Sequence, residues 1–325
     1  MIPLLNNFLK TDTESFVAIN LGNQYIKGLV VKGDEIIDFF LKEKKDIPTT
    51  LREIWQEKKI TTDTVKISLK DAATIVRYFP FPKLEKKKIK QTLFYELNKH
   101  IPFPPEEVYF DFSILEELNP SEIFVLLAVA KKEFINNILQ IFEKEKMKVS
   151  SITLDSICLI NLFLKNQAET KINSCILDIG NSFSTLTILK KETPHLTRDI
   201  GFGIKDIFNI ISHTKNMPLE EIENWFACVE NHNEVLELSQ DSISGLCKEI
   251  KSSFDYFEVN KGERVEKLYL TGGLTYIKNI DNVFKDYLDV ETGFLDNAQN
   301  LKISFSKEDF NRVKNSFSVA LGLVL

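Results

Sequence analysis

The stretch "AINLGNQYIKGLVV", residues 18–31, has a gapless counterpart in "LDIGNSFSTLTILK", residues 177–190. An offset of 158 residues superimposes the two glycine turns and aligns Asn20 with Asp178, Gly22 with Gly180, and Asn23 with Asn181. The residues after each turn are apolar or β-branched, a pattern that predicts a β-hairpin. A hairpin that occurs twice with the same turn indicates an internal duplication.

Each copy opens a run of three β-rich segments. The pattern predicts one antiparallel meander from about residue 16 and a second from residue 174. Amphipathic segments after each meander predict helices. Among them are 48–58, capped by a threonine after a proline, and a long helix through 233–260. The sequence therefore predicts an α/β protein made of two similar halves.

The composition is that of an ordinary globular protein. The chain has 325 residues, 43% of them hydrophobic and 27% charged, with a net charge of −6. Bulk charge thus gives no reason to expect a nucleic-acid partner. The four cysteines and four histidines show no metal-ligand spacing. No apolar run reaches the ~20 residues of a membrane span. These features favour a reduced, cytoplasmic protein.

The glycine turns have the residues of a phosphate site. Backbone N–H groups in a tight turn bind anions, and glycine lets a phosphate approach the backbone. An aspartate ahead of the turn, such as Asp178, can hold hydrated Mg²⁺, and the ammonium of Lys27 can pair with a phosphate. The double glycine at 272–273 can lie against a sugar and base. Each motif by itself is more often an ordinary hairpin turn, so the combination carries the interpretation.

That combination, a meander, its duplicate and then strand–TGG–helix, resembles the actin–Hsp70–sugar kinase superfamily. The resemblance implies an actin-like (ribonuclease H-like, duplicated) two-lobe ATPase fold and ATP or ADP with Mg²⁺ as cofactors. It implies three groups of nucleotide-binding residues: Asn20, Gly22, Asn23 and Lys27; Asp178, Gly180 and Asn181; and Thr271, Gly272 and Gly273. Asp178 is also the candidate metal and catalytic residue.

The segment between the two meanders narrows the resemblance. "TIVRYFPFPK" (74–83), "IPFP" (101–104), "EEV" (106–108) and Asp111 resemble the type IV pilus assembly PilM family. Actin, Hsp70 and sugar kinases lack the "IPFP–EEV" run. Later segments, among them "LTRDIGFGIKDI" and "LTGGLTYIKNID", match the family in order.

The PilM resemblance implies an architecture like that of the cell-division protein FtsA, with a small 1C-type insert. The expected parts are subdomain 1A, the insert, the continuation of 1A, the second lobe (2A and 2B), and a C-terminal helix that returns to the first lobe: 1–72, 73–148, 149–170, 171–305 and 306–325.

The resemblance also implies a role. PilM-like proteins are cytoplasmic scaffolds at the inner face of the cytoplasmic membrane, where they bind the N-terminal tail of the bitopic protein PilN and connect to pilus motor ATPases. Peripheral membrane association then comes through the partner. Two alternatives stay open: an FtsA-like filament protein, and a small-molecule kinase of the same superfamily, for which the sequence offers no polar substrate cluster.

Three residues depart from the family pattern. Asn23 stands where the family has a serine, and its amide can still donate to a phosphate. Asn20 stands where the first turn usually has aspartate, so we expect a weakened Mg²⁺ site and slow ATPase activity at most. Phe202 separates Gly201 from Gly203, where the family tends to have adjacent glycines. Asp155 and Asp178 are the candidates for a general base.

Overall fold

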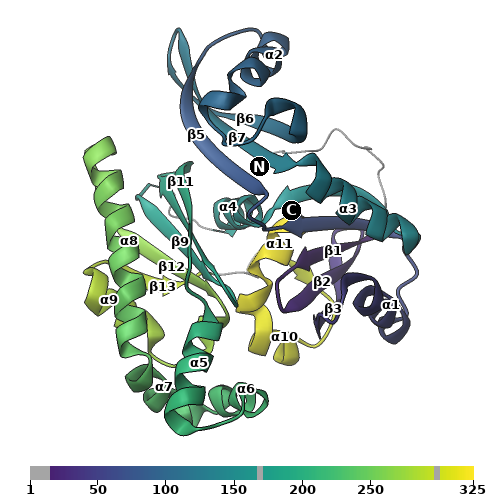
Figure 1. Ribbon diagram of the computed structural model, residues 1–325, viewed down its shortest axis with the longest axis vertical. Coiled ribbons are helices and arrows are strands. Elements are labelled where there is room, and N and C mark those ends of the chain that lie inside the picture. Colours follow the sequence, from purple (N-terminus) through teal and green to yellow (C-terminus); the bar gives the residue numbers. More distant parts are fainter. Residues whose placement is uncertain (1–14, 167–170, 296–300) are drawn as a thin grey trace. The chain divides into compact units, whose positions relative to one another are not determined.

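The computed structural model describes residues 15–166, 171–295 and 301–325. The chain divides into two compact units (Figure 1). Of the described residues, unit 1 contains 15–165, 301–312 and 319–325, and unit 2 contains 166, 171–295 and 313–318.

Unit 1 contains a six-stranded sheet in the order β14-β3-β2-β1-β4-β8. Its strands are β1 (Ser15–Leu21), β2 (Tyr25–Lys32), β3 (Glu35–Glu43), β4 (Thr64–Leu69), β8 (Lys148–Leu154) and β14 (Lys302–Ile303). The first three form the predicted antiparallel meander, and β4 and β8 continue in parallel from β1. Helices α1 (Ile47–Lys58) and α3 (Lys132–Lys144) pack on one face through Leu51, Ile54, Ile135, Ile138 and Phe142.

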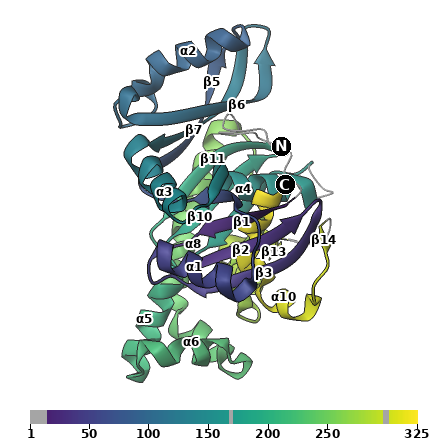
Figure 2. The ribbon, with the colours of Figure 1, turned by 90° about the vertical axis from the view of Figure 1, so that its right-hand side faces the viewer.

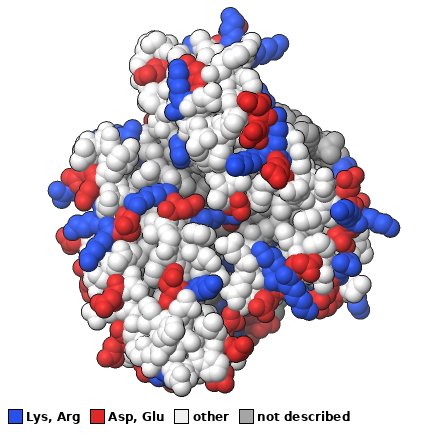
Figure 3. Space-filling model, viewed as in Figure 1, with Lys and Arg blue, Asp and Glu red and all other residues white. Residues whose placement is uncertain are grey.

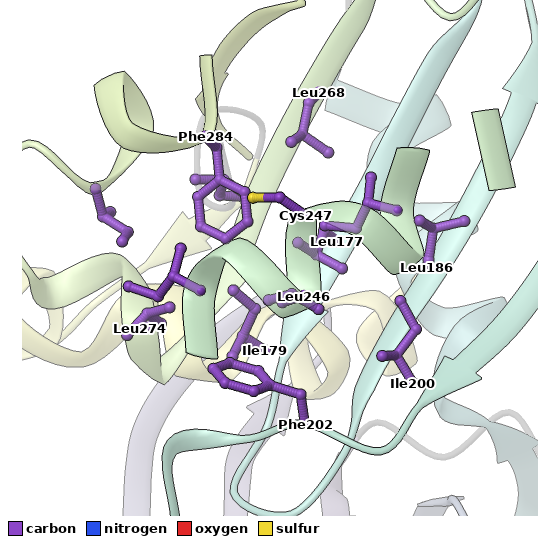
Figure 4. Close-up of a cluster of buried hydrophobic side chains, with 14 of the residues drawn as sticks. Leu177, Ile179, Leu186, Ile200, Phe202, Leu246, Cys247, Leu268, Leu274 and Phe284 are labelled. Atoms are coloured by element: carbon purple, nitrogen blue, oxygen red, sulfur yellow. The ribbon is translucent and has the colours of Figure 1, made fainter. Parts of the chain in front are cut away.

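Unit 2 contains a five-stranded sheet in the order β11-β10-β9-β12-β13. Its strands are β9 (Ser174–Ile179), β10 (Ser184–Lys190), β11 (Thr193–Ile200), β12 (Lys267–Gly272) and β13 (Glu291–Phe294). Its helices are α5 (Ile204–Lys215), α6 (Leu219–Ala227), α7 (His232–Leu238), α8 (Gln240–Lys261) and α9 (Ile280–Leu288). Figure 4 shows part of the core between sheet and helices, including Leu177, Phe202, Leu246 and Phe284.

The order of strands confirms the duplication. In both sheets a meander of three antiparallel strands is followed by two parallel strands, so β3-β2-β1-β4-β8 corresponds to β11-β10-β9-β12-β13. Each glycine turn joins the first strand of its meander to the second. Both turns therefore lie at the carboxyl end of a central strand, the edge where ligands bind in many α/β folds.

An insert within unit 1 has its own sheet. Strands β5 (Thr74–Pro82), β6 (Val108–Asn119) and β7 (Glu122–Lys131) pair in the order β5-β7-β6. Helix α2 (Lys86–Glu96) crosses one face of this sheet (Figure 2). The residues buried together between helix and sheet are Phe81, Ile89, Leu93, Ile123 and Val125. A second cluster buries Ile101 of the "IPFP" run against β7. The insert thus has a core of its own.

Helix α4 (Asp155–Asn166) follows β8, and two helices end the chain, α10 (Lys307–Val313) and α11 (Ser318–Val324). Gly322 lies against α4, because a Cβ on it would be 2.0 Å from the carbonyl oxygen of Cys158. In the part of the chain that the structure describes, no helix is long and apolar enough to cross a membrane.

Two helix predictions were wrong in detail. Helix α1 begins at Ile47 and is capped by Asp46, whose carboxylate accepts the Thr49 N–H at 2.8 Å. Proline lacks an N–H and fits inside the first turn, so the cap lies ahead of it. The predicted long helix is two helices that meet at Ser239, whose hydroxyl donates back to the Val235 carbonyl at 2.5 Å. Such side-chain bonds compete with the helical ladder.

Candidate functional site

The first glycine turn, residues 22–24, joins β1 to β2. A Cβ on Gly22 would be 2.7 Å from the carbonyl oxygen of Tyr25, so the turn requires glycine. The backbone N–H of Asn23 donates to no residue that the structure describes. The Lys44 ammonium donates to the Gly22 carbonyl at 2.8 Å. The turn therefore presents an N–H group beside a positive charge, a combination that suits an anion.

A polar cluster lies directly ahead of this turn and is centred on Asn20, which is 4% exposed. Strand register places Lys27 across from Asn20 on β2 and Ser68 across from it on β4. The Asn20 amide nitrogen donates to the Ser68 hydroxyl at 3.0 Å and to both carboxylate oxygens of Asp155 at 3.1 and 3.0 Å. The structure thus brings together Asn20 and Lys27, which the sequence named as nucleotide-binding residues, and Asp155, its candidate base.

The cluster does not fit a magnesium ion bound between the side chains of Asn20 and Asp155. Mg²⁺ requires oxygen ligands in octahedral geometry. Here the amide N–H₂ group of Asn20 faces the Asp155 carboxylate, which occupies that carboxylate with hydrogen bonds. Among the described residues, no group of three or more His, Cys, Asp or Glu side chains can hold a metal.

The second turn, residues 180–183, joins β9 to β10. The Gly180 N–H donates to the Phe183 carbonyl at 3.1 Å, and a Cβ on Gly180 would be 2.9 Å from that oxygen. The carbonyls of Gly180 and Asn181 accept the N–H groups of Ile204 and Lys205, both at 3.0 Å. The turn is therefore held by the first residues of α5, which satisfies N–H groups that a helix start leaves unpaired.

The N–H group of Asn181 in this turn donates to no described residue. Gly203 explains the close approach of α5, since a Cβ there would be 2.2 Å from the Asn181 carbonyl oxygen. A Cβ on Gly201 would contact nothing within 4 Å. Phe202 enters the core of unit 2, and its carbonyl accepts the Ser184 hydroxyl at 2.8 Å. The departure at Phe202 therefore leaves the close-packing glycine in place.

Asp178 lies next to the double glycine. Strand β9 pairs in parallel with β12, so Asp178 faces Thr271 in the register. Gly272 has a φ of +86°, and a Cβ on it would be 2.6 Å from Oδ1 of Asp178 and 2.4 Å from the Ile179 carbonyl oxygen. Only glycine fits this position without strain. The unit thus gathers Asp178, Gly180, Asn181 and Gly272.

Thr271 has a structural contact. Its side chain is fully buried, and its hydroxyl bonds with the Asn315 carbonyl at 2.9 Å and with the Ser318 hydroxyl. Gly273 packs on α5, since a Cβ there would be 2.2 Å from Cδ1 of Ile204. The Thr271 side chain therefore holds the C-terminal segment, and contact of this loop with a nucleotide through its backbone stays a prediction.

Sequence reasoning missed Ser68 and Lys44. Ser68 lies in the strand "TVKISL", where Thr64 and Lys66 are also polar, so nothing in the strand singles it out for a polar contact. Lys44 stands in a charged run, "KEKK", where nothing distinguishes it from its neighbours. The pair Asn20–Asp155 joins residues 135 positions apart, and no local pattern predicts it.

Comparison with known proteins gives one matching family and several solved structures that share the fold of this chain. The family model described as type IV pilus assembly protein PilM matches residues 20–325. A chain of the structure described as "PilM-PilN type IV pilus biogenesis complex" is 20% identical, with a TM-score of 0.86 over 97% of this chain and 98% of that chain.

Two further structures share the fold at lower similarity. The ethanolamine utilization protein EutJ from Carboxydothermus hydrogenoformans has 11% identity and a TM-score of 0.58, over 98% of this chain and 91% of that one. MreB 5 of Spiroplasma citri, bound to AMPPNP, has 12% identity and a TM-score of 0.52, over 96% and 95%. The predicted fold class, a duplicated actin-like α/β fold, is confirmed.

Proposed function

Because this chain belongs to the type IV pilus assembly PilM family, we propose that it is an actin-like scaffold that binds the N-terminal cytoplasmic tail of a PilN-like bitopic membrane protein. One observation carries the proposal: the family match runs through the insert as well as both duplicated halves. The insert distinguishes this family from general actin-like proteins, so its presence favours pilus assembly over a kinase.

The membrane partner would determine where in the cell the scaffold lies. A tail from a bitopic protein would hold the chain at the inner face of the cytoplasmic membrane, and pilus motor ATPases are the further partners it would connect. The face in Figure 3 has Lys and Arg interspersed with Asp and Glu, which suits protein contacts better than a nucleic-acid backbone. Membrane association through the partner requires no span in the chain itself.

The scaffold would respond to ATP or ADP through its glycine turns. Gly22 and Asn23 in unit 1, and Gly180 and Asn181 in unit 2, are the phosphate contacts that we propose, with Gly272 and Gly273 near the sugar and base. Asp178 would hold a metal-bound phosphate through water. Hydrolysis would be slow or absent, because Asn20 replaces the usual aspartate and its amide occupies the Asp155 carboxylate.

The test uses a synthetic peptide with the sequence of the N-terminal cytoplasmic tail of a PilN-like bitopic protein. Fluorescence anisotropy should show saturable binding to the whole chain and loss of binding after deletion of residues 74–131, which carry the sheet of the insert and leave α3 in the core of unit 1. Retained calorimetric binding of ATP by the deletion variant is the control that its remaining parts are folded. Peptide binding that survives the deletion would contradict the assignment to the insert.

A further inference from the structure

Lys44 differs from the other lysines around it. Lys42 pairs with Glu53 and Glu57, Lys45 pairs with Glu53 at 3.1 Å, and Lys58 pairs with Asp38. Lys44 has no carboxylate partner among the residues that the structure describes, and its ammonium is bonded to the Gly22 carbonyl. Partial burial lowers the pKa of this lysine, because desolvation penalises its charged form.

Lys44 is bonded to the first turn through both its side chain and its backbone. Besides the side-chain bond, the backbone N–H of Lys44 donates to the Gln24 carbonyl at 2.7 Å. The equivalent carbonyl in the second turn, that of Gly180, accepts a neutral backbone N–H from α5. A neutral donor is therefore enough to hold such a turn. A charged donor adds cost in a half-buried place unless an anion offsets it.

The neighbouring cluster has no place for a metal to supply that charge. The Asn20 amide takes the position of the second carboxylate and bonds with Asp155 directly. Lys27, which lies across from Asn20 in the strand register, and Lys44, on the Gly22 carbonyl, bring two positive formal charges to the first turn. A phosphate group at the turn would balance these charges.

We infer that Lys44 is a phosphate-binding residue of the first turn and that it takes over the charge that Mg²⁺ supplies in related sites. The inference rests on the proposed nucleotide-binding function, adds one binding residue to it, and removes the requirement for a divalent cation at the first turn. The ligand is the polyphosphate chain of a nucleotide, bound at this turn without a divalent ion. Asn20 makes the metal unnecessary, because its amide N–H₂ group donates hydrogen bonds to the Asp155 carboxylate that would otherwise bind a cation.

The experiment is calorimetry of ATP, ADP and inorganic tripolyphosphate in EDTA, with the full chain. Wild type should bind in EDTA, and Lys44→Gln should weaken that binding by about tenfold or more, as loss of a charged hydrogen bond does. Lys44→Arg should keep most of the affinity. Lys45→Gln, the neighbour with the same change of charge, should bind like wild type.

A second measurement separates charge from structure. If Lys44 only supports the turn, the salt dependence of the affinity should be the same in wild type and in Lys44→Gln. If Lys44 binds phosphate, the affinity of Lys44→Gln should depend less on salt concentration than the affinity of wild type does. The melting temperatures of the two proteins without ligand should then be equal. Circular dichroism checks that each variant is folded.

Each outcome decides the inference. Equal affinity of Lys44→Gln and wild type in EDTA overturns it, and so does wild-type binding that appears only with Mg²⁺. Tripolyphosphate binding that depends on Lys44, without ATP binding, leaves the inference standing and removes the nucleotide from the proposed function. Binding of neither ligand overturns both, while binding of the partner peptide still tests the scaffold separately.

Discussion

Replacing Asn20 by aspartate tests the electrostatics of the first turn most directly. The amide nitrogen of Asn20 lies 3.0 and 3.1 Å from the two carboxylate oxygens of Asp155. The variant puts a second carboxylate in its place. Two unit charges about 4 Å apart repel by about 4 kcal/mol at an effective dielectric constant near 20. The hydrogen bonds to Asp155 are lost as well.

Protonation limits this cost. One carboxyl of the pair can bind a proton, which costs about 1.4 kcal/mol for each pH unit above the ordinary carboxyl pKa near 4. We therefore expect Asn20→Asp to lower the free energy of unfolding by about 3–4 kcal/mol near pH 7 and by about 1–2 kcal/mol near pH 5. The sign follows from linkage: the pKa of the pair is raised in the folded state, so stability falls as pH rises.

The assay is urea unfolding followed by circular dichroism at both pH values, with and without millimolar Mg²⁺. The two carboxylates form a cation site in the variant, so Mg²⁺ should recover stability, about 2.7 kcal/mol at a concentration 100 times its dissociation constant. Wild type should not respond to Mg²⁺ in the absence of nucleotide, because its amide faces Asp155.

Asn23→Asp is the matched control. It makes the same change of residue and charge three positions along the chain, on an exposed side chain. It should change stability by no more than about 0.5 kcal/mol and should show no pH or Mg²⁺ response. An Asn20→Asp protein that is as stable as wild type near neutral pH, or that ignores Mg²⁺, would refute the account of the Asn20–Asp155 contact.

Three further changes test the packing of unit 2 and the cysteines. Gly272→Ala should lower the free energy of unfolding in urea by about 2–4 kcal/mol, because Gly272 has a φ of +86° and a Cβ there would lie 2.4 Å from a backbone oxygen. Gly201→Ala is the control: a Cβ there has nothing within 4 Å, so the change should cost less than about 1 kcal/mol. Thr271→Val should cost about 1–3 kcal/mol, since the Asn315 carbonyl loses one of its two hydroxyl donors and the Ser318 hydroxyl loses its bond with Thr271; a melting temperature equal to wild type would contradict this. Iodoacetamide on the native protein should label exposed Cys228 first, because burial raises the pKa of the other three thiols, that of Cys247 to about 12; mass spectrometry showing equal labelling of all four would disprove it.

Hydrogen bonds join the C-terminal segment to the loop that follows β12 in unit 2. Thr271 bonds with Asn315 and Ser318, and Tyr276 accepts the Ser316 N–H at 3.2 Å. The loop proposed to contact the sugar and base is thus bonded to the segment that leads into α11.

The sequence by itself determined the parts of this protein that depend on local pattern. Apolar and β-branched runs between turn residues located the strands of both meanders, and the repeat around Gly22 and Gly180 predicted two similar halves that each open with a meander. Glycine is required at both turns because a Cβ would meet backbone within 2.9 Å, and such a need is visible as a glycine at a fixed place between two strands. The insert carries its own motif, "IPFP–EEV", and so identifies the family.

Only the tertiary structure decided which side chains meet. Asn20 contacts Asp155 because β1, β4 and β8 lie side by side, and that register joins residues 135 positions apart. The same is true of Lys44 on the Gly22 carbonyl and of Thr271 on Asn315. Local sequence sets backbone conformation through sterics and hydrophobic period, whereas charge partners depend on strand order and distance in space. The substitution at Asn20, read in the sequence as a lost charge, is in the fold a hydrogen-bond donor that occupies the remaining carboxylate.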